Sequence, residues 1–154
     1  MNKQFIERAI GIAAQSAQSG GGPFGAVIVK DGRIIAESSN SVTRDLDPSA
    51  HAEVNAIRAA CKKLGTYNLQ GCEIYASCEP CPMCLGAIYW ARLSGLYFAA
   101  TRRDAEDAGF DDGFIYQEFA KDPARRTIPT ERITADSALR PFEKWKELAD
   151  KKEY

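Results

Sequence analysis

The sequence predicts an α/β fold in which helices cover a mixed β-sheet. The Asp31-Gly32 pair lies between two apolar segments, a pattern typical of an antiparallel hairpin. Each later segment of strand character is separated from the previous one by a segment of helical periodicity. Such strand–helix–strand crossovers give parallel pairing, so the sheet should combine both directions. With 154 residues, the chain suits a single domain, residues 1–154, with a sizeable core.

The first half of the chain predicts a helix, the hairpin and a second helix. Apolar residues recur at helical spacing in both helical segments, which end at Gly20-Gly21-Gly22 and at Gly65. The expected ranges are about 3–18 for the first helix, 23–29 and 33–37 for the strands, and 49–64 for the second helix. The second helix carries His51 and Glu53 in its first turn.

The second half predicts two more strands and several helices. The expected strands are 72–76 and 95–100, with a helix at 83–92 between them and a weakly alternating short strand at 128–134. Pro82 suits the first turn of the helix at 83–92. Short helices are expected on either side of a glycine-bounded loop at 109–113. A final helix has Pro141 in its first turn and apolar residues at helical spacing.

A metal site is predicted by Pro80-Cys81-Pro82-Met83-Cys84. Its two thiols lie three residues apart and can bind one zinc ion, while His51, the only histidine, supplies a third ligand. Three protein ligands leave a fourth position for water, and zinc lowers the pKa of such a water to about 7. Glu53 is placed to accept its proton. His-x-Glu followed by Pro-Cys-x-x-Cys is the signature of zinc deaminases that act on amino-substituted bases.

Two other metal sites compete with this interpretation. Cys78, Cys81 and Cys84 could begin an iron–sulfur motif, but that motif needs a further cysteine where this chain has Ile88. Cys78 could also close a structural zinc site as a fourth ligand. That site would leave Glu53 without a role, and Cys78 falls where a strand should end. We therefore expect Cys78 to lie outside the metal shell.

Composition argues against several partners. The formal net charge of −1 provides no basic surface for a long polyanion, which disfavours a nucleic-acid substrate. No apolar run approaches membrane-spanning length, and the charged N-terminus lacks an apolar signal region. The five cysteines are best explained as reduced thiols. These features lead us to expect a cytoplasmic protein that acts on a small molecule.

The order of the elements resembles the cytidine-deaminase-like fold, a three-layer α/β/α sandwich around a mixed sheet of roughly five strands. Over nearly its whole length the chain also resembles the bacterial guanine deaminases. The matching stretches are residues 22–27, 47–54, 77–91, 109–112 and the terminal 151–154. The histidine and cysteine motifs specify only the superfamily. Phe110-Asp111-Asp112 and the Lys-Lys-Glu-Tyr tail are the parts that point to guanine.

This resemblance implies a reaction and a set of roles. The reaction is the hydrolytic loss of the 2-amino group of guanine, giving xanthine and ammonia. Glu53 accepts the water proton, protonates ring N3 and helps to protonate the leaving amine, while Asp112 assists at the amine. A helix N-cap is the structural alternative for Asp112. A guanosine deaminase, another nucleobase or nucleoside deaminase, and a structural zinc module remain the alternative functions.

The resemblance also implies substrate contacts and an assembly. Asn40 and the backbone of Ala52 read the edge of the base, and Phe24 and Trp90 flank its ring. Turn formation is the alternative role for Asn40, and core packing is the alternative for the two aromatic residues. In this family the C-terminal segment, here about 137–154, crosses to the partner subunit of a domain-swapped homodimer. Tyr154 would then cover the partner's pocket, unless the segment folds back on its own subunit.

Overall fold

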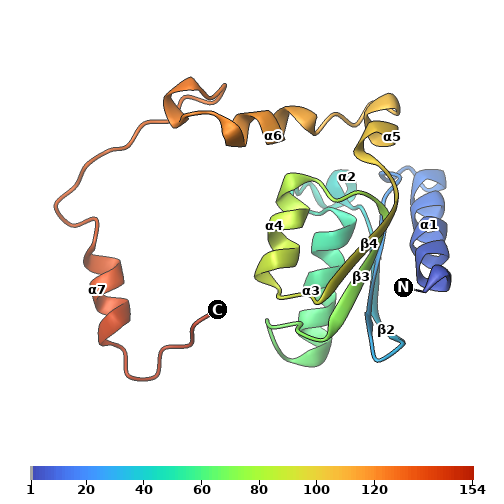
Figure 1. Cartoon of the computed structure of the whole chain (residues 1–154), viewed down its shortest axis with the longest axis horizontal. Helices are drawn as coiled ribbons and strands as arrows, with labels where there is room; N and C mark the ends of the chain where they lie inside the picture. Colours follow the sequence, from blue (N-terminus) through green and yellow to red (C-terminus); the bar gives the residue numbers. More distant parts are fainter. Residues whose placement is uncertain (1) are drawn as a thin grey trace. The chain divides into compact units, whose positions relative to one another are not determined.

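The computed structural model describes residues 2–154 and divides the chain into two compact units, Met1–Gly113 and Phe114–Tyr154. The first unit contains the sheet and its covering helices (Figure 1). Within residues 2–154, no helix combines the length and apolar character that a membrane span requires.

The sheet has four strands in the order β2-β1-β3-β4: β1 (Gly25–Lys30), β2 (Arg33–Ser39), β3 (Cys72–Cys78) and β4 (Gly95–Ala100). β1 is antiparallel to both β2 and β3, whereas β3 and β4 are parallel, so the predicted mixed sheet is confirmed. The expected count of roughly five strands is wrong for the described residues, which form four. Only one of the two predicted crossovers joins adjacent parallel strands, because β1 lies between β2 and β3.

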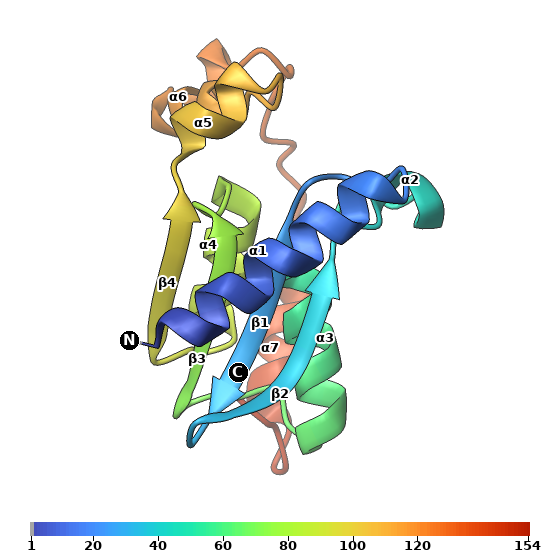
Figure 2. The same cartoon turned by 90° about the vertical axis from the view of Figure 1, so that its right-hand side faces the viewer.

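Helices cover both faces of the sheet. α1 (Lys3–Gln18) packs on one face, and α3 (Ala52–Leu64) and α4 (Pro82–Trp90) lie on the other (Figures 1 and 2). The alternation of side chains along β1 explains how one strand serves both cores: Val27 joins the cluster with α1, and Ile28 joins the cluster with α3. Both side chains are fully buried. The predicted three-layer α/β/α sandwich is therefore confirmed.

The remaining elements show where the sequence pattern succeeded and failed. The sequence did not predict α2 (Val42–Asp45), whereas α5 (Arg102–Asp107) and α6 (Gly113–Ala120) confirm the two short helices. The strand expected at 128–134 is wrong, because this segment pairs with no other strand in the described chain. α7 (Arg140–Glu147) confirms the final helix, with proline in its first turn as expected.

The second unit buries little apolar surface of its own. It contains most of α6, the 3-10 helix η1 (Pro123–Arg125) and α7. No residue of α6 or α7 is buried, and the side chains of Phe142 and Leu148 are 64% and 52% exposed. An isolated helix as short as α7 is not stable in water, so its apolar face needs a covering surface.

Candidate active site

Two helix N-termini bring the predicted metal ligands together. His51 is the N-cap residue of α3, Cys81 is the N-cap residue of α4, and Cys84 lies in the first turn of α4. The two helices pack against each other on the same side of the sheet. His51 Nδ1 lies 3.5 Å from the Sγ atom of Cys81 and 3.5 Å from that of Cys84. All three ligand atoms lie within 4.8 Å of one another.

These separations fit a zinc ion. Bonds of about 2.05 Å to nitrogen and 2.3 Å to sulfur, meeting at a tetrahedral angle, place the two ligand atoms about 3.6 Å apart. The observed nitrogen–sulfur distances of 3.5 Å agree with that spacing. One imidazole and two thiols are also the donor set expected for the deaminase motif. His51, Cys81 and Cys84 are therefore placed so that together they could hold a metal ion, as the sequence predicts.

Hydrogen bonds among the three candidate ligands shift their pKa values in different directions. The pKa of the Cys81 thiol is lowered to about 4 by its hydrogen bonds with Cys84 and with His51. The same contact with Cys81, together with burial, raises the pKa of the Cys84 thiol. The hydrogen bond with Cys81 also raises the pKa of His51. A binding cation must displace the Cys84 proton, so metal uptake is coupled to proton release.

Glu53 lies beside the metal ligands without belonging to them. Its side chain is buried, with 7% of its surface exposed, and its Oε2 accepts a hydrogen bond from the Cys84 thiol at 3.5 Å. Burial is the main cause that raises the pKa of this carboxyl above its ordinary value. A raised pKa suits a group that accepts and returns a proton near neutral pH.

Cys78 is not one of the three candidate ligands, because its thiol makes a hydrogen bond elsewhere. It is the last residue of β3, and its buried Sγ donates to the carbonyl oxygen of Thr101 at 3.4 Å. Burial raises the pKa of this thiol to about 11, so it stays protonated at neutral pH. The candidate ligand group contains His51, Cys81 and Cys84 and does not include Cys78. This arrangement supports an open fourth coordination position.

We expect Cys78→Ser to retain zinc and activity, because the hydroxyl can donate to the same Thr101 carbonyl oxygen. Zinc content by elemental analysis and steady-state kinetics check this result. Cys61→Ser is a matched control at a cysteine that packs against the core under α3. Loss of zinc from the Cys78 variant alone would instead support the closed structural site.

Three of the predicted substrate-site residues lie at the ends of sheet strands or at the start of α3. Phe24 immediately precedes β1 and packs edge-on against Phe110, with ring centroids 5.0 Å apart. Ala52, fully buried, is the first residue of α3 and stands between His51 and Glu53. Asn40 follows β2, and its Oδ1 accepts a hydrogen bond from Val42 N at 3.2 Å. This hydrogen bond belongs to the turn that the sequence offered as the alternative role for Asn40.

Asp112 is electrostatically coupled to the metal ligands. Burial raises the pKa of this half-buried carboxyl, and the neighbouring Cys81 raises it further. Asp112 also contributes to the raised pKa of His51. At the start of α6, Asp111 Oδ1 accepts a hydrogen bond from Gly113 N at 2.9 Å. Asp112 is therefore near enough to Cys81 and His51 for their charges to affect one another, and its part in catalysis stays a prediction.

The other two predicted contacts are exposed. Trp90 is the last residue of α4, at the end opposite Cys81, and its side chain is 63% exposed. The Arg92 guanidinium lies 5.9 Å from the Trp90 ring centroid. Tyr154, in the second unit, is 75% exposed. Contacts of Trp90 and Tyr154 with a base stay predictions.

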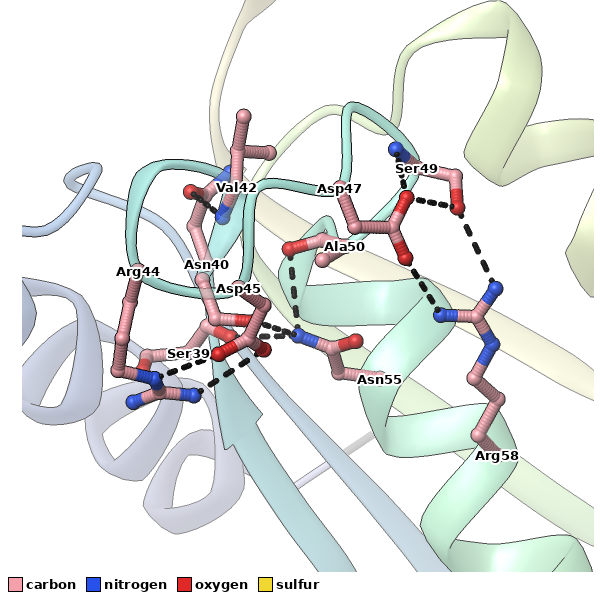
Figure 3. A network of polar contacts seen from close by, with 11 residues as sticks. Ser39, Asn40, Val42, Arg44, Asp45, Asp47, Ser49, Ala50, Asn55 and Arg58 are labelled. Carbon is pink, nitrogen blue, oxygen red and sulfur yellow. Dashed lines mark hydrogen bonds and ion pairs between the residues drawn. The ribbon is translucent and has the colours of Figure 1, made fainter.

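Asn55, whose side chain lies beside the loop before His51, was not predicted from the sequence. Figure 3 shows its side chain pointing from α3 toward the loop that connects β2 with His51. The spacing contained a signal, since Asn55 follows His51 by four residues and so lies on the same face of the helix. That signal is weak, because a polar residue on a helix is usually explained by solvent exposure.

Comparison of the chain with known protein families and structures agrees with this geometry. Residues 1–100 match the model of the cytidine and deoxycytidylate deaminase zinc-binding region. The chain therefore belongs to this zinc-binding deaminase family.

Individual relatives refine the similarity. The chain is 56% identical to the guanine deaminase of Bacillus subtilis over 154 residues, which cover 99% of each protein. It also superposes on the X-ray structure of guanine deaminase from Bacillus subtilis with a TM-score of 0.98, covering 100% of this chain and 99% of the other. The chain is 44% identical to the tRNA-specific adenosine deaminase of Aquifex aeolicus over 96 residues, which cover 62% of this chain and 64% of that protein.

Proposed function

We propose that this chain catalyses the hydrolytic deamination of guanine to xanthine and ammonia. The observation that carries the proposal is the three-ligand site with the buried carboxyl of Glu53 beside it. The choice of guanine is supported by the similarity to a guanine deaminase, which extends through the C-terminal third of the chain. The similarity to the tRNA-specific enzyme covers a smaller part of the chain.

Glu53 and Asp112 have different roles in this proposal: Glu53 transfers protons, and Asp112 assists at the leaving amine. When bound by His51, Cys81 and Cys84, zinc supplies a water of lowered pKa. Glu53 accepts the first proton of this water and passes it to ring N3. It then accepts the second proton of the same oxygen and passes it to the leaving amine, so that both water protons are used. Its raised pKa allows the carboxyl to hold each proton between acceptance and release. Asp112, whose pKa is also raised, accepts a hydrogen bond from the departing amino group.

Base recognition uses groups at the edges of the same site. The amide of Asn40 offers a donor and an acceptor to the edge of the purine. The backbone N–H of Ala52, at the start of α3, has no partner within its own helix and can donate to the base. Phe24, held in place by its contact with Phe110, flanks the ring, and Trp90, although it lies at the end of α4 opposite Cys81, is the second proposed flanking residue.

The active assembly in this proposal is a domain-swapped homodimer. Residues 1–154 work as one deaminase domain whose segment of about 137–154 passes to the partner subunit, where Tyr154 covers the pocket. The exposed apolar side chains of α7 support an exchange of this kind, because they need a surface to cover them. A second copy of the chain offers such a surface to each tail.

Ammonia release from a panel of bases and nucleosides tests the substrate. With purified zinc-loaded protein, we expect guanine to give the highest kcat/KM and guanosine a lower value, since the ribose adds bulk at a covered pocket. Cytosine, cytidine and adenosine should release little ammonia. A higher kcat/KM for guanosine would assign the site to the nucleoside. No release from any compound at full zinc occupancy would favour the structural zinc module.

A further inference from the structure

We infer that Asn55 is a positioning residue that fixes the segment around Asn40 relative to His51. The inference rests on the proposed role of Asn40 at the edge of the base. It adds a residue that touches neither substrate nor metal but links the elements that do.

The side-chain nitrogen of Asn55 joins the two ends of one loop. Nδ2 donates to the carbonyl oxygen of Ser39 at 3.1 Å, to Ser41 Oγ at 2.9 Å and to the carbonyl oxygen of Ala50 at 3.2 Å (Figure 3). Ser39 and Ser41 flank Asn40, and Ala50 precedes His51. Because two of the acceptors are carbonyl oxygens, only the amide nitrogen can face them.

The backbone reinforces both ends of this link. Ser41 N donates to the carbonyl oxygen of Ala50 at 2.9 Å, which closes the loop at the same oxygen that accepts from Asn55 Nδ2. Asn55 N donates to the carbonyl oxygen of His51 at 2.9 Å, so the residue that holds the loop is also bonded to the metal ligand's backbone. Ser41 is buried, which protects these hydrogen bonds from competition by water.

The middle of the loop has a second, weaker attachment to α3. Arg58 contacts Asp47 Oδ2 at 3.5 Å and Ser49 Oγ at 3.3 Å, and Asp47 Oδ1 accepts from Ser49 N at 2.8 Å (Figure 3). More than half of the Arg58 side chain is exposed. Exposed ion pairs contribute little to stability, so this attachment holds the loop less firmly than the hydrogen bonds of Asn55 at its two ends.

Asn40 is closely confined on its other sides. Its backbone N donates to the carbonyl oxygen of Phe24 at 3.1 Å. A Cβ atom at Gly22 would lie 2.9 Å from Asn40 Cγ, so this approach requires glycine. In such a confined position, a displacement of Ser39 or Ser41 turns the Asn40 amide away from the edge of the base. Misplacement of a positioning group by about 1 Å can cost about 100-fold in rate.

Asn55→Asp tests the inference with little change of shape. It replaces the donating nitrogen by an oxygen that faces two carbonyl oxygens. We expect KM for guanine to rise about tenfold, the effect of losing a hydrogen bond or slightly more, with kcat changed less than about threefold. Zinc should stay near one per chain. Asn68→Asp is the matched control, because Asn68 Oδ1 only accepts from Gln70 N in an exposed turn and a carboxylate can do the same.

A double variant separates this inference from the proposed function. Asn40→Ala alone tests the contact with the base and should raise KM. If Asn55 acts through Asn40, adding Asn55→Asp to Asn40→Ala leaves KM unchanged. If the two substitutions together raise KM by the product of their separate effects, the inference is wrong, whereas the contact of Asn40 with the base still stands. An unchanged KM in Asn40→Ala would overturn the contact and the inference together, whereas the substrate panel still tests guanine deamination itself.

A second variant covers the case in which Asn55→Asp does not fold. Ser41→Ala keeps Asn55 and removes one of its three acceptors. We expect a smaller rise of KM, about threefold, again with zinc retained. An unchanged KM, or a loss of zinc with unchanged KM in the remaining holoenzyme, would contradict positioning of Asn40.

Discussion

The Glu53→Gln variant is expected to keep about one zinc per chain and to lose most of its turnover. Glutamine preserves the shape of the side chain and removes the group that accepts and returns the proton. General acid–base catalysis contributes about 10²–10⁴-fold, so kcat should fall by that factor. The metal should remain because the ligand group consists of His51, Cys81 and Cys84. Zinc analysis and ammonia release on the same preparation measure both quantities.

Glu7→Gln provides the matched control for this experiment. Glu7 is exposed on α1, which covers the face of the sheet opposite α3 and α4 (Figures 1 and 2). The control should retain both zinc and kcat. Loss of zinc from Glu53→Gln would show that Glu53 is a ligand. Equal turnover in the two variants would show that another group carries the proton.

The metal site could be predicted from the sequence because local spacing determines most of its geometry. Cys81 and Cys84 lie on one turn, and Pro82 starts the helix that orients them. His51 and Glu53 are likewise fixed by the start of α3. The remaining requirement was that two helix N-termini meet, and α3 and α4 do meet on one face of the sheet. The order of strands, helices and crossovers favours that meeting but does not determine its distances.

The features that the sequence did not reveal depend on long-range contacts. Whether a weakly alternating segment such as 128–134 becomes a strand depends on whether a neighbouring edge is available, and local pattern contains no such information. The placement of β1 between β2 and β3 is a choice among sheet orders that all satisfy the hairpin and the crossovers. The role of Asn55 needs the loop from Ser39 to Ala50 to fold back onto α3.

Removal of the last few residues, including Tyr154, is expected to raise KM for guanine and lower kcat while zinc binding is unchanged. The metal ligands lie in the first unit and Tyr154 lies in the second, so truncation leaves the ligand set intact. If Tyr154 covers the pocket as proposed, its loss opens the pocket to water and weakens binding of the ring. Tyr154→Phe is the matched control, because it retains the ring and removes only the hydroxyl.

Mixing the truncated chain with full-length Glu53→Gln shows whether the tail acts on its own subunit or on its partner. In a swapped heterodimer, the truncated chain keeps an intact Glu53 and receives the tail of the other chain, so one of the two sites is complete. Random assembly of equal amounts would restore about a quarter of the wild-type activity per site. If each tail instead folds back on its own subunit, every site lacks either its tail or Glu53. Mixed dimers verified by differential tags would then show no recovery, and the proposed exchange would be wrong.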